Sequence, residues 1–345
     1  MSEFKKGWTN NDGYRYSYDG KNYIISKAYT FSGNTLYLFG SDVPAGYYPN
    51  KDSDKWGVKG SFEITDSMQS PAENIDIISN QASDGTKLTR GTTAAVINSA
   101  NTADYQFDIQ GYTNTSNSAK GGAVYNSSNK TLTVNQGSVF KNNHATQGNG
   151  GAIYNDGTLT VAQGSTFEGN SAQNGGAVYN ASNKNLTIYG DSTITNNIAT
   201  SEGGAVYNAG TLTLDTTNGD ITFSGNMANT NVANDIYNNG TLKISGGKTV
   251  SLGGGINNAS QNKDGSIEVD GTTLKLGSNA DIYTNTLSFS NATLNAADGA
   301  DLFANGNINF TDTAVTLANS EINGSNLTFT GGSLCRLYTS DAADE

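Results

Sequence analysis

The chain has 345 residues with a formal net charge of −12, and only 14% of its residues are charged. This length allows a sizeable buried core, while an acidic balance without a basic stripe argues against a nucleic-acid partner. No apolar run is long enough to cross a membrane, and the first residues, Met1–Trp8, lack the apolar core of a signal peptide.

Aromatic residues are concentrated in residues 1–70, where eight of the 18 Tyr residues lie within the first 48 positions. Alternating patterns at Asn22–Ser26 and Thr35–Phe39 indicate strands. Terminal units of repeat arrays are usually atypical because they cover an exposed core end. We therefore predict a β-rich N-terminal cap, or irregular coils, over 1–70, and looser coils over 71–120.

A six-residue phrase then returns four times, with starts 29, 25 and 28 residues apart. Its copies are Gly121–Asn126, Gly150–Asn155, Gly175–Asn180 and Gly203–Asn208. A second phrase, Phe or Ile followed by two variable residues and Asn, alternates with the first. Its copies are Phe140–Asn143, Phe167–Asn170, Ile194–Asn197 and Phe223–Asn226. A fixed period of this length indicates stacked units.

Between the two phrases, apolar and polar residues alternate with period two, as in Gly157–Val161. Each repeat therefore predicts three short strands of about four residues separated by Gly and Asn corners. Such units form the coils of a parallel β-helix, in which stacked Asn side chains can make hydrogen-bonded ladders. The residues that we expect to point inward are Leu132, Val134, Leu159, Val161, Leu186, Ile188, Leu212 and Leu214.

The parallel β-helix is expected over 71–333, with regular repeats over 121–245 and degenerate coils over 246–333. Asp235–Asn238 replaces the first phrase once, and Asp281–Tyr283 and Asp301–Phe303 are weaker copies. The segment 334–345 departs from this pattern. Written back into codons, Leu337–Glu345 resembles a sequencing adapter, so we interpret 334–345 as a non-native tail.

The paired motifs resemble the repeats of polymorphic outer-membrane proteins and related autotransporter passengers. The resemblance is close over Gly121–Asn226. It implies a right-handed parallel β-helix, or solenoid, that is exported to the cell surface and used as an adhesin or structural stalk. The chain shows neither an export signal nor a C-terminal barrel, so we interpret it as a fragment that would reach the outer membrane only through a missing barrel.

The alternative function is a β-helical carbohydrate-active enzyme, either a polysaccharide lyase or a hydrolase. A lyase needs a base and cations, and a hydrolase needs two carboxylates in one groove. The chain has three Arg residues and scattered carboxylates, and its only His, His144, shares a repeat column with Ser171, Ile198 and Met227. We predict no catalytic residue, no cofactor and no metal site.

One column of aromatic residues is the candidate binding surface. Each Tyr follows an aliphatic residue, and since alternate residues face opposite ways, one of the two columns must point inward. The aliphatic column stays aliphatic even where Ala becomes Asp235, so we place it inside and the tyrosines outside. This surface ladder consists of Tyr125, Tyr154, Tyr179, Tyr207 and Tyr237. Its candidate partners are a host-cell receptor, a matrix protein or a glycan, although stacking alone is the simpler explanation.

Overall fold

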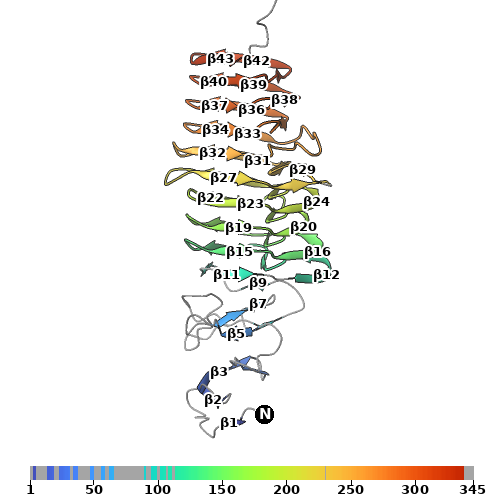
Figure 1. Cartoon of the computed structure of the whole chain (residues 1–345), viewed down its shortest axis with the longest axis vertical. Coiled ribbons are helices and arrows are strands. Elements are labelled where there is room, and N and C mark those ends of the chain that lie inside the picture. The colour runs from blue at the N-terminus through green and yellow to red at the C-terminus, as the bar shows by residue number, and fades with distance from the viewer. Residues whose placement is uncertain are drawn as a thin grey trace, which may run out of the picture.

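The computed structural model describes residues 121–229 and 231–337 with their side chains. Before residue 121 it describes the backbone of the strands and the side chains of Asn114, Ser118, Ala119 and Lys120. All regular elements in this part of the chain are strands, and Figure 1 shows them as coils stacked along the long axis. No helix that could span a membrane occurs among the described residues.

Four sheets form the sides of the stack, and their strands pair in parallel with equivalent strands of neighbouring coils, except for the antiparallel pairs β7–β8 and β28–β29. Sheet 1 contains β10 (Thr102–Tyr105), β14 (Thr131–Val134), β18 (Thr158–Val161), β22 (Asn185–Tyr189), β26 (Thr211–Asp215), β31 (Thr241–Ser245), β33 (Ser266–Asp270), β36 (Thr286–Ser290), β39 (Asn307–Thr311) and β42 (Asn326–Thr330). Sheet 2 contains β11 (Asp108–Gln110), β15 (Val139–Lys141), β19 (Thr166–Glu168), β23 (Thr193–Thr195), β27 (Ile221–Ser224), β32 (Thr249–Leu252), β34 (Thr273–Leu276), β37 (Thr293–Ala296), β40 (Ala314–Ala318) and β43 (Ser333–Leu337).

The other two sheets are shorter or interrupted. Sheet 3 contains β12 (Thr113–Lys120), β16 (His144–Asn149), β20 (Ser171–Asn174), β24 (Ile198–Glu202), β28 (Met227–Ala228) and β29 (Val232–Ala233). Sheet 4 contains β8 (Thr89–Arg90), β7 (Phe62–Thr65), β9 (Ala95–Asn98), β13 (Val124–Asn126), β17 (Ile153–Asn155), β21 (Val178–Asn180), β25 (Val206–Asn208) and β30 (Ile236–Asn238). Single bridges through Ile256 link it to a continuation made of β35 (Ile282–Thr284), β38 (Leu302–Ala304) and β41 (Ile322–Asn323).

The remaining strands precede the stack. They are β1 (Glu3–Phe4), β2 (Tyr14–Tyr18), β3 (Tyr23–Phe31), β4 (Asn34–Tyr37), β5 (Tyr47–Pro49) and β6 (Trp56–Val58). β1 to β4 pair antiparallel in sequence order, and β5 pairs antiparallel with β6, unlike the parallel coils. The N-terminal part is thus β-rich and different in topology, while the boundary at residue 70 stays a prediction.

The all-β parallel β-helix is confirmed, but the number of strands per regular coil was predicted wrongly. One coil runs through β13, β14, β15 and β16, so it has four strands instead of three. The additional strands of sheet 3 follow the second phrase, where a small inward residue fits beside the core: Ala145, Ala172 and Ala199 are buried. Three strands per coil occur only where sheet 3 has ended, as in β30, β31 and β32 and again from β35 onward.

Apolar residues of all coils fill the interior. The eight residues predicted to point inward are each at most 1% exposed, and Phe140 and Phe167 stack at 4.8 Å between ring centroids. Burial of this kind contributes about 1.5–3 kcal/mol for each large apolar side chain. A shared core along the axis is therefore what holds the coils together.

The first phrase is explained position by position. Gly175 has a φ of 60°, which favours glycine, and a Cβ on Gly176 would lie 2.1 Å from the carbonyl oxygen of Gly204 in the next coil. Ala177 is fully buried behind them. The corner after β16 and its equivalents therefore requires two glycines and one small residue in succession.

Two ladders of buried asparagines join the coils, as the sequence predicted. In the first, each Nδ2 donates to the Oδ1 of the next residue at 2.7–2.8 Å, through Asn126, Asn155, Asn180, Asn208 and Asn238. The second runs at 2.9–3.0 Å through Asn143, Asn170, Asn197 and Asn226. Since an unpaired buried amide would cost about 1–3 kcal/mol, the ladders fix the alignment of the coils.

The second ladder ends at a carboxylate. Asn226 donates to Oδ1 of the fully buried Asp235 at 2.8 Å, and the backbone N–H of Gly254 donates to its Oδ2 at 2.7 Å. At this joint β28 pairs antiparallel with β29, and sheet 3 ends. Asp235 therefore closes the wide part of the helix and holds the first narrow coil.

The C-terminal strand β43 includes the first residues of the predicted non-native tail. Within it Arg336 pairs with Leu317, so a charged residue occupies a core column there. Leu327, Phe329 and Leu334 of the last coil are exposed, although their column neighbours are buried. The origin of the tail stays a prediction, and residues 338–345 lie outside the described residues.

Candidate functional site: a tyrosine ladder on sheet 4

The five predicted tyrosines form one continuous ladder on the outer side of sheet 4. They pair directly in register, and the rings of Tyr154, Tyr179, Tyr207 and Tyr237 stack at 4.7–4.8 Å between centroids. Tyr125 meets Tyr154 edge to face at 5.6 Å. The preceding aliphatic residues are buried, so the predicted inward and outward directions of the two columns are confirmed.

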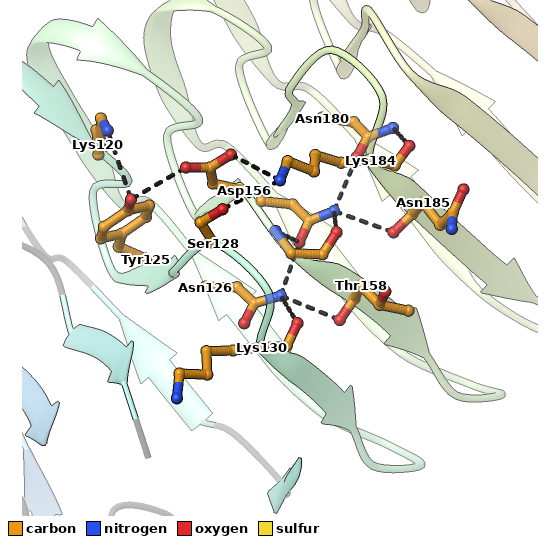
Figure 2. A network of polar contacts seen from close by, with 12 residues as sticks. Lys120, Tyr125, Asn126, Ser128, Lys130, Asp156, Thr158, Asn180, Lys184 and Asn185 are labelled. Carbon is orange, nitrogen blue, oxygen red and sulfur yellow. Dashed lines mark hydrogen bonds and ion pairs between the residues drawn. The ribbon is translucent and has the colours of Figure 1, made fainter. Parts of the chain in front are cut away.

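Polar contacts hold the first ring of the ladder. Figure 2 shows Lys120 and Asp156 on either side of the Tyr125 hydroxyl, each at 3.4 Å. Lys184 forms an ion pair with Asp156 at 3.4 Å, and the Lys120 ammonium lies 5.0 Å from the centroid of the Tyr125 ring. A cation over an aromatic face is attractive, so Lys120 is drawn toward the ladder.

A loop closes the other end of the ladder. Asn257 takes the place of the next aromatic residue and begins the loop Asn257–Gly265. Within this loop Asn262 donates to the Tyr237 hydroxyl at 2.7 Å. Aromatic stacking resumes only beyond the loop, where Tyr283 and Phe303 stack at 4.8 Å. The loop thus divides the aromatic column into two segments.

The hydroxyls of Tyr154, Tyr179 and Tyr207 have no hydrogen-bond partner among the described residues. Burial raises the pKa of all three hydroxyls, and it raises that of Tyr207 to about 12 together with the neighbouring tyrosines and Glu202. The ladder therefore carries protonated hydroxyls that can both donate and accept hydrogen bonds.

The residue before each pair of glycines forms a second column beside the ladder, at the end of sheet 3. Lys120 pairs with Asn149, Asn149 with Asn174, and Asn174 with Glu202. We call these four residues the flank column. It has a cation at one end, two amides in the middle and a carboxylate at the other end. The sequence analysis missed it, although the position before each Gly-Gly was visible in the repeat.

Stacking limits what the ladder can bind. The ring faces of the central tyrosines are covered by their neighbours at 4.7–4.8 Å, so a ligand cannot stack on them. Only the ring edges and the hydroxyls remain open to a partner. The face is therefore suited to repeated hydrogen bonding along the axis, and not to aromatic stacking on a sugar ring.

The other residues considered in the sequence do not join this face. His144 pairs with Ser171 on sheet 3, and its Nδ1 lies 2.6 Å from the Ser171 Oγ. Ile198 and Met227 continue the same column, as the repeat predicted. Within the described ranges, no group of three His, Cys, Asp or Glu residues could hold a metal ion.

The fold and this face define a parallel β-helical repeat protein whose coils share one set of ladders. Residues 137–156, 164–181 and 191–209 match the family model of the Chlamydia polymorphic membrane protein repeat. The resemblance drawn from the paired motifs is confirmed for this part of the chain. No curated protein and no solved structure matches the chain significantly.

Proposed function

We propose that the chain is part of a surface-exposed passenger that acts as an adhesin or a structural stalk and binds host or matrix components. The observation that carries this proposal is the match of three segments to repeats of a family of outer-membrane and surface proteins. The long stack of coils with a continuous ladder supports it, because an elongated surface can repeat one weak contact at each coil. No arrangement among the described residues favours the carbohydrate-active alternative.

The tyrosine ladder is the proposed contact surface. Replacing Tyr154 and Tyr179 with Phe keeps the stacked rings and removes two hydroxyls that lack a partner. We expect this double variant to melt like the wild type and to attach more weakly to cultured cells and to arrayed glycans. The corresponding double Ala variant should also lose stability, since each stacked aromatic pair contributes about 0.5–1.5 kcal/mol.

The matched control is Thr160→Ala with Thr187→Ala, which alters neighbouring outward positions of sheet 1 on the same coils. This control should attach like the wild type. Equal attachment of the double Phe variant and the wild type would remove the hydroxyls from the contact. Equal attachment of all variants, including the double Ala variant, would reduce the ladder to surface stacking.

A further inference from the structure

The two ends of the flank column carry opposite charges without ion pairs. Lys120 is exposed and contacts only aromatic rings and a hydroxyl, and no carboxylate among the described residues pairs with it. At the other end Glu202 is hydrogen-bonded to Ser260 of the loop, and its Oε2 is buried without a hydrogen-bond partner, so Glu202 contributes its charge to this face and not an open carboxylate oxygen. Asp264, exposed on the same loop, adds a second negative charge near Tyr237.

We propose that the partner of this face is a second copy of the chain, packed side by side and antiparallel. The two-fold axis passes between the coils of Tyr154 and Tyr179. This inference rests on the proposed function in taking the tyrosine ladder as a contact surface, and it names the partner of that surface.

The order of residues in the flank column favours this arrangement. Along the axis the column is Lys120, Asn149, Asn174, Glu202, and in a copy that runs the other way the same column is Glu202, Asn174, Asn149, Lys120. Each ammonium then faces a carboxylate and each amide faces an amide. A two-fold interface requires such a self-complementary patch. A parallel pair would instead place Lys120 opposite Lys120, which is repulsive.

The spacing of the ladder also fits a second copy. Its rungs repeat at 4.7–4.8 Å because they follow the strands of a parallel sheet. A second β-helix of the same sequence has the same rise for each coil, so the two copies stay in register and a contact made at one coil recurs at the next. Each weak contact is thus multiplied along the shaft.

The unpartnered hydroxyls would be used in the same arrangement. With the axis between the coils of Tyr154 and Tyr179, the Tyr154 hydroxyl faces Tyr179 of the other copy, and Tyr207 faces Tyr125. A phenol can donate one hydrogen bond and accept another, so identical groups can satisfy each other. Because their pKa values are raised, these hydroxyls keep their protons near neutral pH.

The test is the mass of the purified chain in solution, measured by sedimentation equilibrium in reducing buffer so that Cys335 cannot form a disulfide. An ionic strength near 0.15 M limits the repulsion between two copies of net charge −12, because the Debye length is then about 8 Å. We expect a dimer of twice 36.0 kDa for the wild type. Lys120→Glu alone and Glu202→Lys alone should each be monomeric, since each places like charges opposite one another twice.

A mixture of the two variants is the decisive sample. In a mixed antiparallel pair every charge again faces its opposite, so the mixture should return to dimer mass, as should the double variant Lys120→Glu/Glu202→Lys. If circular dichroism shows that Glu202→Lys is misfolded, Glu202→Gln replaces it in the mixture, because it also removes the repulsion from the Lys120→Glu copy. A monomeric wild type at high concentration, or a mixture that stays monomeric, would overturn the proposal.

These outcomes are independent of host binding, because no host component is present. A dimer that does not attach to cells would contradict the proposed adhesin function and leave the pairing intact. Attachment by a monomeric wild type would contradict the pairing alone.

Discussion

Asp235 is the residue at which the wide and narrow parts of the helix meet. An Asn at this position could not keep both contacts, because Asn226 and the N–H of Gly254 donate to different oxygens, and an amide would turn its NH2 group toward one of these donors. The carboxylate provides two acceptors, but its burial raises its pKa from 3.8 to about 6 despite these hydrogen bonds. The joint therefore depends on an acid that is partly charged near neutral pH.

The raised pKa of Asp235 predicts a change of stability with pH. The folded state holds the proton more tightly than the unfolded state, so this group's contribution is present below about pH 4. It is lost as pH rises through about 6, and the full change is about 3 kcal/mol. This contribution is absent in Asp235→Asn. The difference in unfolding free energy between the variant and the wild type should therefore change by about 3 kcal/mol between pH 4 and pH 7.5.

Denaturant unfolding at several pH values measures this difference. The control is Asp220→Asn, at an exposed position whose side chain accepts from the backbone of Thr249. It should follow the pH dependence of the wild type. A pH profile of Asp235→Asn parallel to that of the wild type would contradict the role of this carboxyl.

At the scale of one coil, the corners determine the alignment of the strands. The residue before each Asn of the second ladder has a positive φ, and it is either Asn or Gly: Asn142, Gly169, Asn196 and Gly225. These are the residue types that adopt left-handed backbone angles most readily. The second phrase therefore contains either Asn-Asn or Gly-Asn because its third position needs a positive φ, which both Asn and Gly adopt.

Gly176→Ala should prevent normal stacking of two coils. The added Cβ would meet backbone atoms of Gly204 and Ile198, at 2.1 and 2.7 Å, and backbone cannot move aside without breaking the ladder. Gly164→Ala is the matched control, because its Cβ would have no neighbour within 4 Å and only the φ of 71° is unfavourable. It should cost about 1–2 kcal/mol. Thermal melting compares them, and equal losses would contradict the steric argument.

The sequence predicted which residues point inward and outward better than it predicted how many strands each coil contains. Period-two alternation and the repeated phrases placed Leu159 and Val161 inside and Tyr154 outside, because both depend on local direction alone. The strand His144–Asn149 was missed since its buried positions hold only two small residues, Ala145 and Gly148. The flank column was missed because the repeat relates Lys120 to Glu202 without showing that their column lies beside the tyrosine ladder.

At the scale of the whole molecule, the chain is a one-dimensional array with a weak point. Each coil contacts mainly its neighbours, so stability is a sum of local terms and interfaces. Sheet 3 ends at β29, and only the narrower coils continue beyond it. We therefore expect two unfolding steps, with residues 266–318 opening before residues 124–215.

Hydrogen exchange followed by mass spectrometry in increasing denaturant tests this order, since it reports opening segment by segment. Asp235→Ala should widen the separation between the two steps, because it removes both hydrogen bonds at the joint. Exchange of both segments at the same denaturant concentration in the wild type would show that they unfold together as one cooperative unit, and would contradict a weak point at the joint.

The change from wide to narrow coils also alters how far the molecule extends along its axis for each residue of sequence. Equivalent residues are 28 apart between Asn180 and Asn208, but 20 apart between Asp281 and Asp301. Since every coil advances about 4.8 Å, the wide part extends about 0.17 Å per residue and the narrow part about 0.24 Å. The wide coils thus use their additional residues to form a fourth side, whereas the narrow coils give a longer axial extension for the same number of residues.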